Sequence, residues 1–273
     1  MTPFGARLQA AVAARGRLCV GIDPHTTLLS AWGLDASARG AREFGLRVVD
    51  AAAGRVGVVK PQVSFFERWG SAGFAALEDV LRAARDAGLV VIADAKRGDI
   101  GSTMSAYAEA WLTPGAPLEA DAVTVHPYLG VGSLEGAARF ALENGKGLFV
   151  LAATSNPEAA VLQTAPAGAE PVAAAVARAV RALDEPGASW SSLGLVVGAT
   201  VELATRGLSA DLLQGIPLLA PGFGHQGARL EQTDALFGTL APQVLASASR
   251  SILSAGPTGL AVAIEQHLAE LEA

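Results

Sequence analysis

Charged side chains gather at the ends of two apolar stretches of the sequence. The run VVIADAKRGD contains Asp94, Lys96 and Asp99, and the run VGVVK ends in Lys60. Side chains two residues apart on a strand lie on the same face, so Asp94 and Lys96 are expected to point in one direction. Placing charges beside apolar strands costs free energy, so a cluster of four charged groups indicates a functional site.

The lysines narrow the chemistry that this cluster can perform. Three of the chain's 20 Lys and Arg residues are lysines, and two of these, Lys60 and Lys96, belong to the cluster. For either lysine alone, a solvated charge at a strand end explains the sequence equally well. Neighbouring carboxylates favour the ammonium form of a lysine, whereas a lysine that forms a Schiff base has to be neutral. Lys96 therefore suits a proton donor or a cationic stabiliser, and a Mg²⁺ ion on the two carboxylates would be repelled by Lys60.

A glycine-rich segment and an arginine later in the sequence suit the binding of an anion. The segment PGFGHQGA contains Gly222, Gly224 and Gly227, which allow the backbone to approach a phosphate closely. Arg250, in the segment SASRSIL, can make a bidentate contact with the same group. For the glycines alone, an ordinary tight loop is the alternative interpretation.

Short apolar runs alternate with alanine-rich helical stretches along the whole sequence. Eight runs have the length and composition of strands, at 18–22, 56–60, 89–95, 122–125, 147–153, 193–199, 217–221 and 243–249. Helices are expected at 37–53, 71–87, 101–111, 133–144, 170–184, 201–206, 228–239 and 257–272. Eight strand–helix units predict a (β/α)₈ barrel. The active site of such a barrel lies at the C-terminal ends of its strands, and the loops after the last two strands often bind phosphate.

An open, doubly wound parallel sheet is the alternative fold. It usually carries a glycine-rich dinucleotide turn after its first strand, whereas here that strand runs into Gly21-Ile22-Asp23-Pro24. The Pro- and Gly-rich interruptions are short and lie between predicted elements, so none resembles a linker between domains. Residues 1–273 are therefore expected to form a single barrel domain, with an N-terminal helix at about 3–15.

The composition excludes several classes of partner. The net charge is −6 and no Lys/Arg-rich run is present, so nucleic acid is not expected as a partner. Apolar runs last about seven residues, whereas a membrane span needs roughly 18. The first residues lack the apolar core and cleavage site of a secretory signal, which predicts a cytoplasmic protein. The lone Cys19 can form neither an intrachain disulfide nor a cysteine-based zinc site.

Taken in order, these motifs resemble those of the orotidine 5′-phosphate decarboxylase family. DAKRGDIG, followed by Thr103, is similar to the D-x-K-x-x-D signature of that family. The other matching segments follow in the family's order over nearly the whole chain: VGIDP at 20–24, VVKPQ at 58–62, VTVHPYLG at 123–130, ATSNP at 153–157, PGFGHQG at 221–227 and SRSIL at 249–253. The extended segment KPQVSFFERWG and an insertion near 158–170 resemble the longer, type 2 subgroup.

The resemblance implies an enzyme that converts orotidine 5′-monophosphate (OMP) to uridine 5′-monophosphate (UMP) and CO₂ without a metal or an organic cofactor. It also implies a homodimer whose two sites are shared between the subunits. Lys60, Asp94, Lys96 and Asp99 would form a network of alternating charge, with Asp99 reaching into the partner's site. Lys96 would protonate carbon 6 of the pyrimidine ring, where CO₂ is lost.

The remaining site residues implied by the resemblance bind parts of the substrate that do not react. Asp23 and Lys60 would hold the ribose hydroxyls, and Ser155 would contact the edge of the pyrimidine. The phosphate would be bound by Gln226 and Arg250 together with Gly222, Gly224 and Gly227. The pocket wall would be completed by Ile100, Thr103 and Pro127.

Two other functions remain open at this point. Mg²⁺-dependent sugar-phosphate decarboxylases and aldolases of the same broader group carry Glu at the end of the second strand, where this chain has Lys60. A catalytically silent phosphate-binding barrel would need Arg250 and the glycine loop, but it would not need Asp94 or Asp99.

Overall fold

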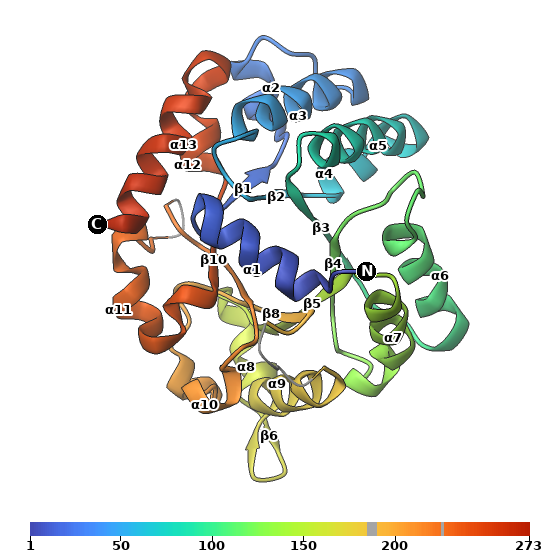
Figure 1. Cartoon of the computed structure of the whole chain (residues 1–273), viewed down its shortest axis with the longest axis vertical. Helices are drawn as coiled ribbons and strands as arrows, with labels where there is room; N and C mark the ends of the chain where they lie inside the picture. The colour runs from blue at the N-terminus through green and yellow to red at the C-terminus, as the bar shows by residue number, and fades with distance from the viewer. Residues whose placement is uncertain (185–189, 225–226) are drawn as a thin grey trace.

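Eight parallel strands close into a barrel in the computed structural model, which describes residues 1–184, 190–224 and 227–273 (Figure 1). Around the barrel the strands follow the order β1-β10-β9-β8-β5-β4-β3-β2. They are β1 (Leu18–Ile22), β2 (Val58–Pro61), β3 (Val90–Arg97), β4 (Ala122–Val125), β5 (Gly147–Ala153), β8 (Leu193–Val197), β9 (Leu218–Pro221) and β10 (Val244–Ala248). These are the eight predicted strands with slightly shifted ends, so the predicted (β/α)₈ barrel is confirmed.

Helices surround the barrel, and one further helix lies across its N-terminal end (Figure 1). The α-helices are α1 (Phe4–Arg15), α2 (Thr26–Ala31), α3 (Ala38–Ala52), α4 (Ser64–Glu67), α5 (Gly70–Asp86), α6 (Gly101–Leu112), α7 (Glu135–Glu143), α8 (Ala160–Gln163), α9 (Val172–Leu183), α10 (Ala210–Leu213), α11 (Thr233–Phe237), α12 (Arg250–Leu253) and α13 (Gly256–Glu272). Short 3₁₀ helices are η1 (Val131–Leu134), η2 (Pro157–Ala159), η3 (Leu203–Arg206), η4 (Leu230–Gln232) and η5 (Gly238–Gln243).

Three predicted helices differ from the structure. The one expected at 228–239 is a succession of η4, the five-residue helix α11 and η5. The helix expected at 201–206 is only the 3₁₀ helix η3, because Gly207 follows with a φ of 65° and ends it. The helix expected at 170–184 begins at Val172, since Glu170 and Pro171 form β7 (Glu170–Pro171), which pairs with β6 (Pro166–Ala167) in a small antiparallel hairpin. This hairpin projects beyond the ring of helices in Figure 1.

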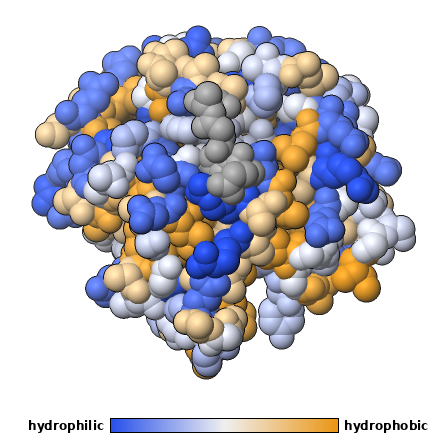
Figure 2. Space-filling view, turned by 60° about the horizontal axis from the view of Figure 1, so that its bottom comes forward, coloured by the Kyte–Doolittle hydropathy of each residue, from blue (hydrophilic) through white to orange (hydrophobic). Residues whose placement is uncertain are grey.

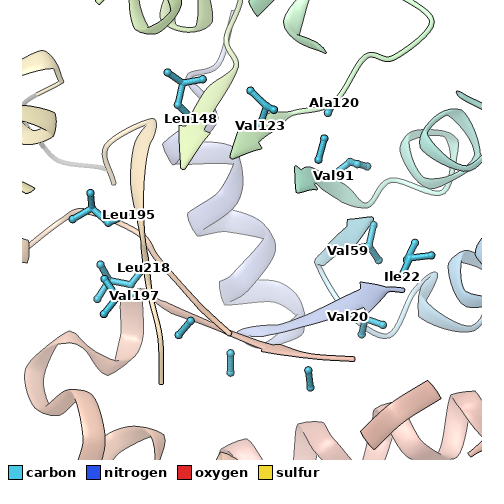
Figure 3. Close-up of a cluster of buried hydrophobic side chains, with 14 of the residues drawn as sticks. Val20, Ile22, Val59, Val91, Ala120, Val123, Leu148, Leu195, Val197 and Leu218 are labelled. Atoms are coloured by element: carbon cyan, nitrogen blue, oxygen red, sulfur yellow. The ribbon is translucent and has the colours of Figure 1, made fainter. Parts of the chain in front are cut away.

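Residues of the barrel strands alternate between two hydrophobic clusters. One cluster lies between strands and helices, and Figure 3 shows its members Val20, Val59 and Val91 pointing outward from the ring of strands. The second cluster fills the barrel interior, with strand residues Cys19, Val58, Val90, Ile92, Ala122, Phe149, Val196, Leu219 and Leu245, and with Phe4 and Leu8 of α1. The next inward positions toward the C-terminal ends are Lys60 on β2, Asp94 on β3 and Thr124 on β4. Strand alternation therefore brings the charged cluster to one end of the barrel.

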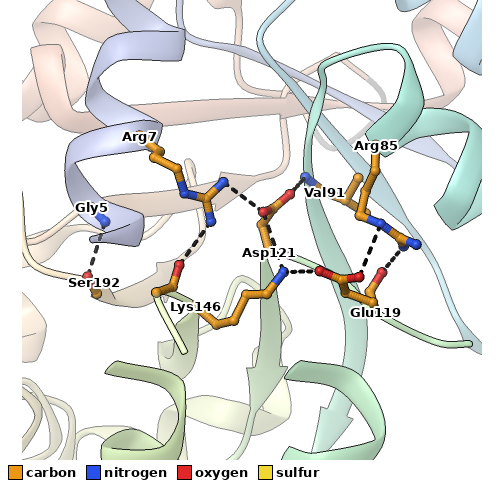
Figure 4. Close-up of polar contacts among 9 residues, drawn as sticks. Gly5, Arg7, Arg85, Val91, Glu119, Asp121, Lys146 and Ser192 are labelled. Atoms are coloured by element: carbon orange, nitrogen blue, oxygen red, sulfur yellow. Dashed lines mark hydrogen bonds and ion pairs between the residues drawn. The ribbon is translucent and has the colours of Figure 1, made fainter. Parts of the chain in front are cut away.

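Polar contacts fix α1 across the opposite end (Figure 4). Arg7 of α1 donates to the carboxylate of Asp121 at 2.8 Å and to the carbonyl of Gly145 at 2.9 Å. Lys146 pairs with Glu119 at 2.6 Å and lies 3.8 Å from Asp121. These contacts hold the N-terminal helix over the base of the barrel, far along the strands from the charged cluster.

Hydrophobic residues on the face shown in Figure 2 lie in separate strips between hydrophilic ones. Three of the exposed hydrophobic residues are Ile100, Tyr128 and Leu129, which are 62%, 75% and 50% exposed. These three side chains follow the C-terminal ends of β3 and β4, at the same end of the barrel as the charged cluster. Among the described residues, no helix is both long enough and apolar enough to cross a membrane.

Candidate active site

A cavity of about 240 Å³ lies at the C-terminal ends of the strands. Its lining includes the predicted site residues Asp23, Lys60, Asp94, Lys96, Gly222 and Arg250. The other lining residues are Gln62, Leu151, Thr154, Val196, Leu219, Pro221, Phe223, Ser247 and Ser249. The cavity thus joins three members of the charged cluster, Lys60, Asp94 and Lys96, to the start of the glycine-rich segment, as the barrel fold predicts.

Asp94 lies between two ammonium groups in this cavity. Its Oδ2 atom is 3.0 Å from Nζ of Lys60, and its Oδ1 atom is 2.5 Å from Nζ of Lys96. The side chains of Lys60 and Asp94 are 6% and 9% exposed, whereas that of Lys96 is 46% exposed. A buried pair therefore anchors one lysine whose end faces the cavity.

The two buried groups stabilise each other's charged forms. Burial alone lowers the pKa of Lys60, but the charges of Asp94 and Asp23 outweigh it and hold that pKa above its usual value. Burial alone raises the pKa of Asp94, but the charges of Lys60 and Lys96 and their hydrogen bonds hold it well below the usual range. At neutral pH the site therefore holds a carboxylate between two cations.

Asp23 follows β1 at the edge of the cavity and presents an unused acceptor. Its Oδ1 atom is buried and accepts no hydrogen bond from any of the described residues. A buried carboxylate oxygen without a donor is costly, so it suits a hydroxyl-bearing ligand. The ring of the neighbouring His25 packs against that of Phe65 at a tilt of 52°, with ring centroids 4.1 Å apart. Burial lowers the pKa of His25, against the raising effect of Asp23.

The glycine-rich loop needs its glycines for its backbone shape. Gly222, Gly224 and Gly227 have φ values of 118°, 75° and 100°, a region that L-residues rarely adopt. The loop closes on itself through a hydrogen bond from the Gly224 N–H to the Ala228 carbonyl at 2.8 Å. A Cβ atom on Gly224 would lie 2.9 Å from Oγ of Ser251, so the loop packs directly against the start of α12.

Arg250 is the first residue of α12 and lies beside this loop at the cavity. Its side chain is exposed, and no carboxylate of the described residues forms an ion pair with it. The guanidinium is therefore available to an anionic ligand. The predicted phosphate ligand Gln226 lies outside the described residues.

Several predicted site residues do not line the cavity of their own chain. Asp99 and the exposed Ile100 lie between β3 and α6, and the Asp99 carboxylate accepts the N–H of Ile100 at 2.8 Å. Thr103 is exposed on α6. Pro127 lines a separate apolar cavity. The structure therefore brings Lys60, Asp94 and Lys96 together but leaves Asp99 out of the network.

The exposed Ser155 follows Thr154, which lines the cavity and is held by Gln163. Oε1 of Gln163, at the end of α8, accepts the N–H of Thr154 at 2.9 Å. Nε2 of Gln163 donates to Oγ1 of Thr154, also at 2.9 Å. Gln163 thus fixes the turn that carries Ser155.

Three polar residues that continue the inward face of two strands were not predicted from the sequence. Ser247 and Ser249 stand two and four residues after the inward-facing Leu245. Gln62 stands two residues after Lys60, and its Oε1 accepts from Nζ of that lysine at 3.5 Å. Every second residue of a strand faces the same side, so continuing the inward positions of these two strands predicts all three residues.

The donor set of this cavity suits an organic anion better than a metal ion. No group of three or more His, Cys, Asp or Glu side chains that could hold a metal is found within residues 1–184, 190–224 and 227–273. The ammonium of Lys60 already occupies one face of the Asp94 carboxylate. A cation bound there would face that charge across a short distance.

Comparison with known proteins gives a consistent result. Residues 16–263 match the family model described as the orotidine 5′-phosphate decarboxylase / HUMPS family. A Salinispora arenicola protein named orotidine 5′-phosphate decarboxylase is 50% identical, with 100% of this chain and 98% of the relative covered. A Streptomyces avermitilis crystal structure assigned to the same enzyme has a TM-score of 0.94 at 46% identity, covering 100% of this chain and 95% of the other. The structure of Leishmania donovani OMP decarboxylase has a TM-score of 0.79 at 30% identity, covering 99% and 98%. With the barrel, its charged mouth and these relatives in agreement, the chain belongs to the orotidine 5′-phosphate decarboxylase / HUMPS family.

Proposed function

We propose that this protein is an orotidine 5′-monophosphate decarboxylase, which converts OMP to UMP and CO₂. The observation that carries the proposal is the Lys60–Asp94–Lys96 network at the base of a cavity that also contains Arg250. Relatives that share about 50% of their sequence with this chain and bear this enzyme's name support the proposal. A cytoplasmic location and a single domain over residues 1–273 belong to the same proposal.

Lys96 is the residue that we place at the reacting carbon. When the bond between C6 and the carboxylate breaks, the electron pair stays on C6 in the plane of the ring, where the π system does not delocalise it. A fixed ammonium beside C6 stabilises this developing carbanion and then transfers a proton to it, giving UMP. The short contact between Nζ of Lys96 and Asp94 holds the ammonium in place before the substrate binds.

Asp94 takes part through its charge. Its carboxylate stays ionised because Lys60 and Lys96 flank it, so it lies as an anion beside the carboxylate that leaves. The repulsion between the two anions is relieved as CO₂ departs. Leu151, Val196 and Leu219 form an apolar part of the same cavity, which suits a neutral product such as CO₂.

Groups remote from C6 bind the rest of the nucleotide. Arg250 and the glycine loop take the phosphate, and Asp23, with its unpartnered Oδ1, takes ribose hydroxyls together with Lys60. Ser155 contacts the pyrimidine edge from the turn held by Gln163. Binding energy from the phosphate, which does not react, lowers the barrier at the ring if it holds the loops closed.

The proposal includes a homodimer in which Asp99 completes the partner's site. Asp99 lies outside its own network, and the neighbouring Ile100 and Tyr128 expose apolar side chains that a second subunit can cover. Mixing the variants Lys96→Ala and Asp99→Ala tests the sharing. In a heterodimer one site then has both residues intact, so a random mixture regains about a quarter of wild-type activity. A mixture as inactive as its two components would refute shared sites.

A Mg²⁺-dependent reaction on a sugar phosphate is the competing function within the family. The resemblance places Glu in those enzymes where this chain has Lys60, and Lys60 is buried against Asp94. A silent phosphate-binding barrel would need only Arg250 and the glycine loop. The charge network therefore favours the decarboxylase over both.

Turnover of OMP by the purified protein, pretreated with EDTA and followed by the fall in ultraviolet absorbance, tests the proposal. We expect activity in EDTA and its loss in Lys96→Ala purified in the same way, which also controls for contaminating host enzyme. Absence of turnover, or turnover that appears only after Mg²⁺ is added, would refute the metal-free decarboxylase. Full activity of Lys96→Ala would refute the role of that lysine.

A further inference from the structure

The pairing between β3 and β4 is interrupted at the charged network. Ala93 pairs with Val123, and the pairing resumes with Arg97 opposite Val125. Residues 94–96 of β3 therefore stand opposite a single residue of β4, Thr124. Such a bulge leaves backbone groups of the longer strand without their usual ladder partners.

The Thr124 side chain takes the place of the missing ladder contact. Its Oγ1 accepts the backbone N–H of Lys96 at 2.9 Å, and its hydroxyl donates to Oδ1 of Asp94 at 2.8 Å. One hydroxyl can donate once and accept as well, so the two contacts are compatible. Thr124 is 0% exposed and does not line the cavity. The threonine thus joins the backbone of one network residue to the side chain of another.

The backbone that Thr124 holds is an unusual one. Lys96 has a φ of 49°, and among the described residues it is the only residue besides glycines with a positive φ. L-residues disfavour this conformation because Cβ crowds the backbone, so it persists only where surrounding contacts hold it. The contact to Thr124 is made by the N–H of that same residue.

We propose that Thr124 is a positioning residue for decarboxylation. It fixes the bulge in the form that directs the Asp94 carboxylate and the Lys96 ammonium to the same point of the cavity. Three donors orient the carboxylate: Thr124 and Lys96 on Oδ1, and Lys60 on Oδ2. Without the hydroxyl, Asp94 loses one of these donors and the Lys96 N–H is left without an acceptor. This role rests on the proposed function, because it concerns the placement of the proton donor.

The variants Thr124→Val and Thr124→Ser separate this role from simple packing. Valine keeps the shape of threonine without the hydroxyl, and serine keeps the hydroxyl with less bulk. We expect Thr124→Val to lower kcat about 10- to 100-fold, since two hydrogen bonds in the network are lost. Thr124→Ser should stay within about threefold of wild type. KM for OMP and the Kd for UMP should change by less than about threefold in both variants, because the hydrogen bonds of Thr124 go to Lys96 and Asp94 and not to the residues proposed to bind phosphate and ribose.

Each outcome bears on the inference. A Thr124→Val variant with wild-type kcat, or a Thr124→Ser variant as impaired as Thr124→Val, would overturn it. So would a loss confined to KM. If Thr124→Val does not fold, as judged by circular dichroism, Thr124→Ala takes its place against Thr124→Ser with the same expectations. Absence of turnover in the wild-type protein would instead overturn the proposed function, and the role of Thr124 with it.

Discussion

The buried pair of Lys60 and Asp94 allows a stability prediction with a definite size. The two charges lie 3.0 Å apart, and both side chains are less than 10% exposed. Coulomb's law at an effective dielectric constant of about 20 gives an attraction of roughly 5 kcal/mol. The substitution Asp94→Asn removes that attraction and leaves a buried ammonium without a carboxylate partner. Losses on removing one member of a buried pair are typically about 3–5 kcal/mol, and we expect the lower part of this range because the amide oxygen still accepts a hydrogen bond.

Thermal unfolding measures this loss directly. At about 2.1 cal/mol/K per residue, the 273-residue chain has an unfolding entropy of roughly 0.6 kcal/mol/K. The expected loss of about 3–4 kcal/mol therefore lowers Tm by about 5–7 °C for Asp94→Asn. All variants are compared at one protein concentration, since an oligomer's Tm depends on it. Asp35→Asn is the matched control, because Asp35 pairs with Arg39 at 2.7 Å with 70% and 85% of the side chains exposed. That change should shift Tm by no more than about 1 °C.

The pH dependence of the Tm difference between wild type and Asp94→Asn follows from the direction in which folding shifts the pKa of Asp94. Because the pKa of Asp94 is lowered by folding, its contribution to stability is complete above the ordinary carboxyl pKa of about 3.9. It is lost as pH falls through the lower pKa of the folded state. The Tm gap between wild type and Asp94→Asn should therefore be constant between about pH 5 and 8 and narrow below about pH 4. An Asp94→Asn variant as stable as wild type at pH 7, or a gap that widens in acid, would refute the reasoning.

Three further changes test other parts of the structure. Arg250→Ala should lower kcat/KM for OMP at least about 100-fold and lower kcat as well, whereas the exposed control Arg39→Ala should leave both unchanged. An unaltered kcat in Arg250→Ala would show that the phosphate contact does not assist the chemical step. Gln163→Leu removes both hydrogen bonds to Thr154 and should lower kcat/KM for OMP about 5- to 30-fold. Inhibition by ribose 5-phosphate, which lacks the pyrimidine, should not change, and weaker inhibition would show that the variant disturbs the whole site. Arg7→Ala should lower Tm by about 2–4 °C and leave kcat at 25 °C unchanged, since α1 lies at the opposite end of the barrel; a fall in kcat would contradict that separation.

The alternation of inward and outward residues within strands made much of the barrel, and Lys60 and Asp94 at the C-terminal ends of its strands, predictable. Buried strands of a parallel barrel read as short apolar runs, and their inward positions lead directly to Lys60 and Asp94. The same rule places Thr124 inward, but it does not reveal what the side chain contacts. That contact depends on the bulge between β3 and β4, which arises from the pairing of residues about 30 positions apart.

Short elements and turns were less predictable for a different reason. The helix α8 has four residues and the strands β6 and β7 have two each, too few to show a hydrophobic period. The positive φ of Lys96 has no signal in the residue type, because lysine normally avoids that region. Asp99 belongs to the predicted signature motif but lies outside the charge network of its own chain, and we propose that it completes the network of another subunit.

The scarcity of lysine has a consequence for the protein's reactivity toward amine reagents. The chain has three lysines, and Lys60 and Lys146 are each 5% exposed and paired with carboxylates. Lys96, with a side chain that is 46% exposed, is then the ε-amine that solvent can reach. Acylating and cross-linking reagents modify many surface lysines on most proteins. Here they are expected to react with the α-amine and with Lys96 at the cavity. Amine coupling thus becomes a probe of the active site, and a bound nucleotide would shield it.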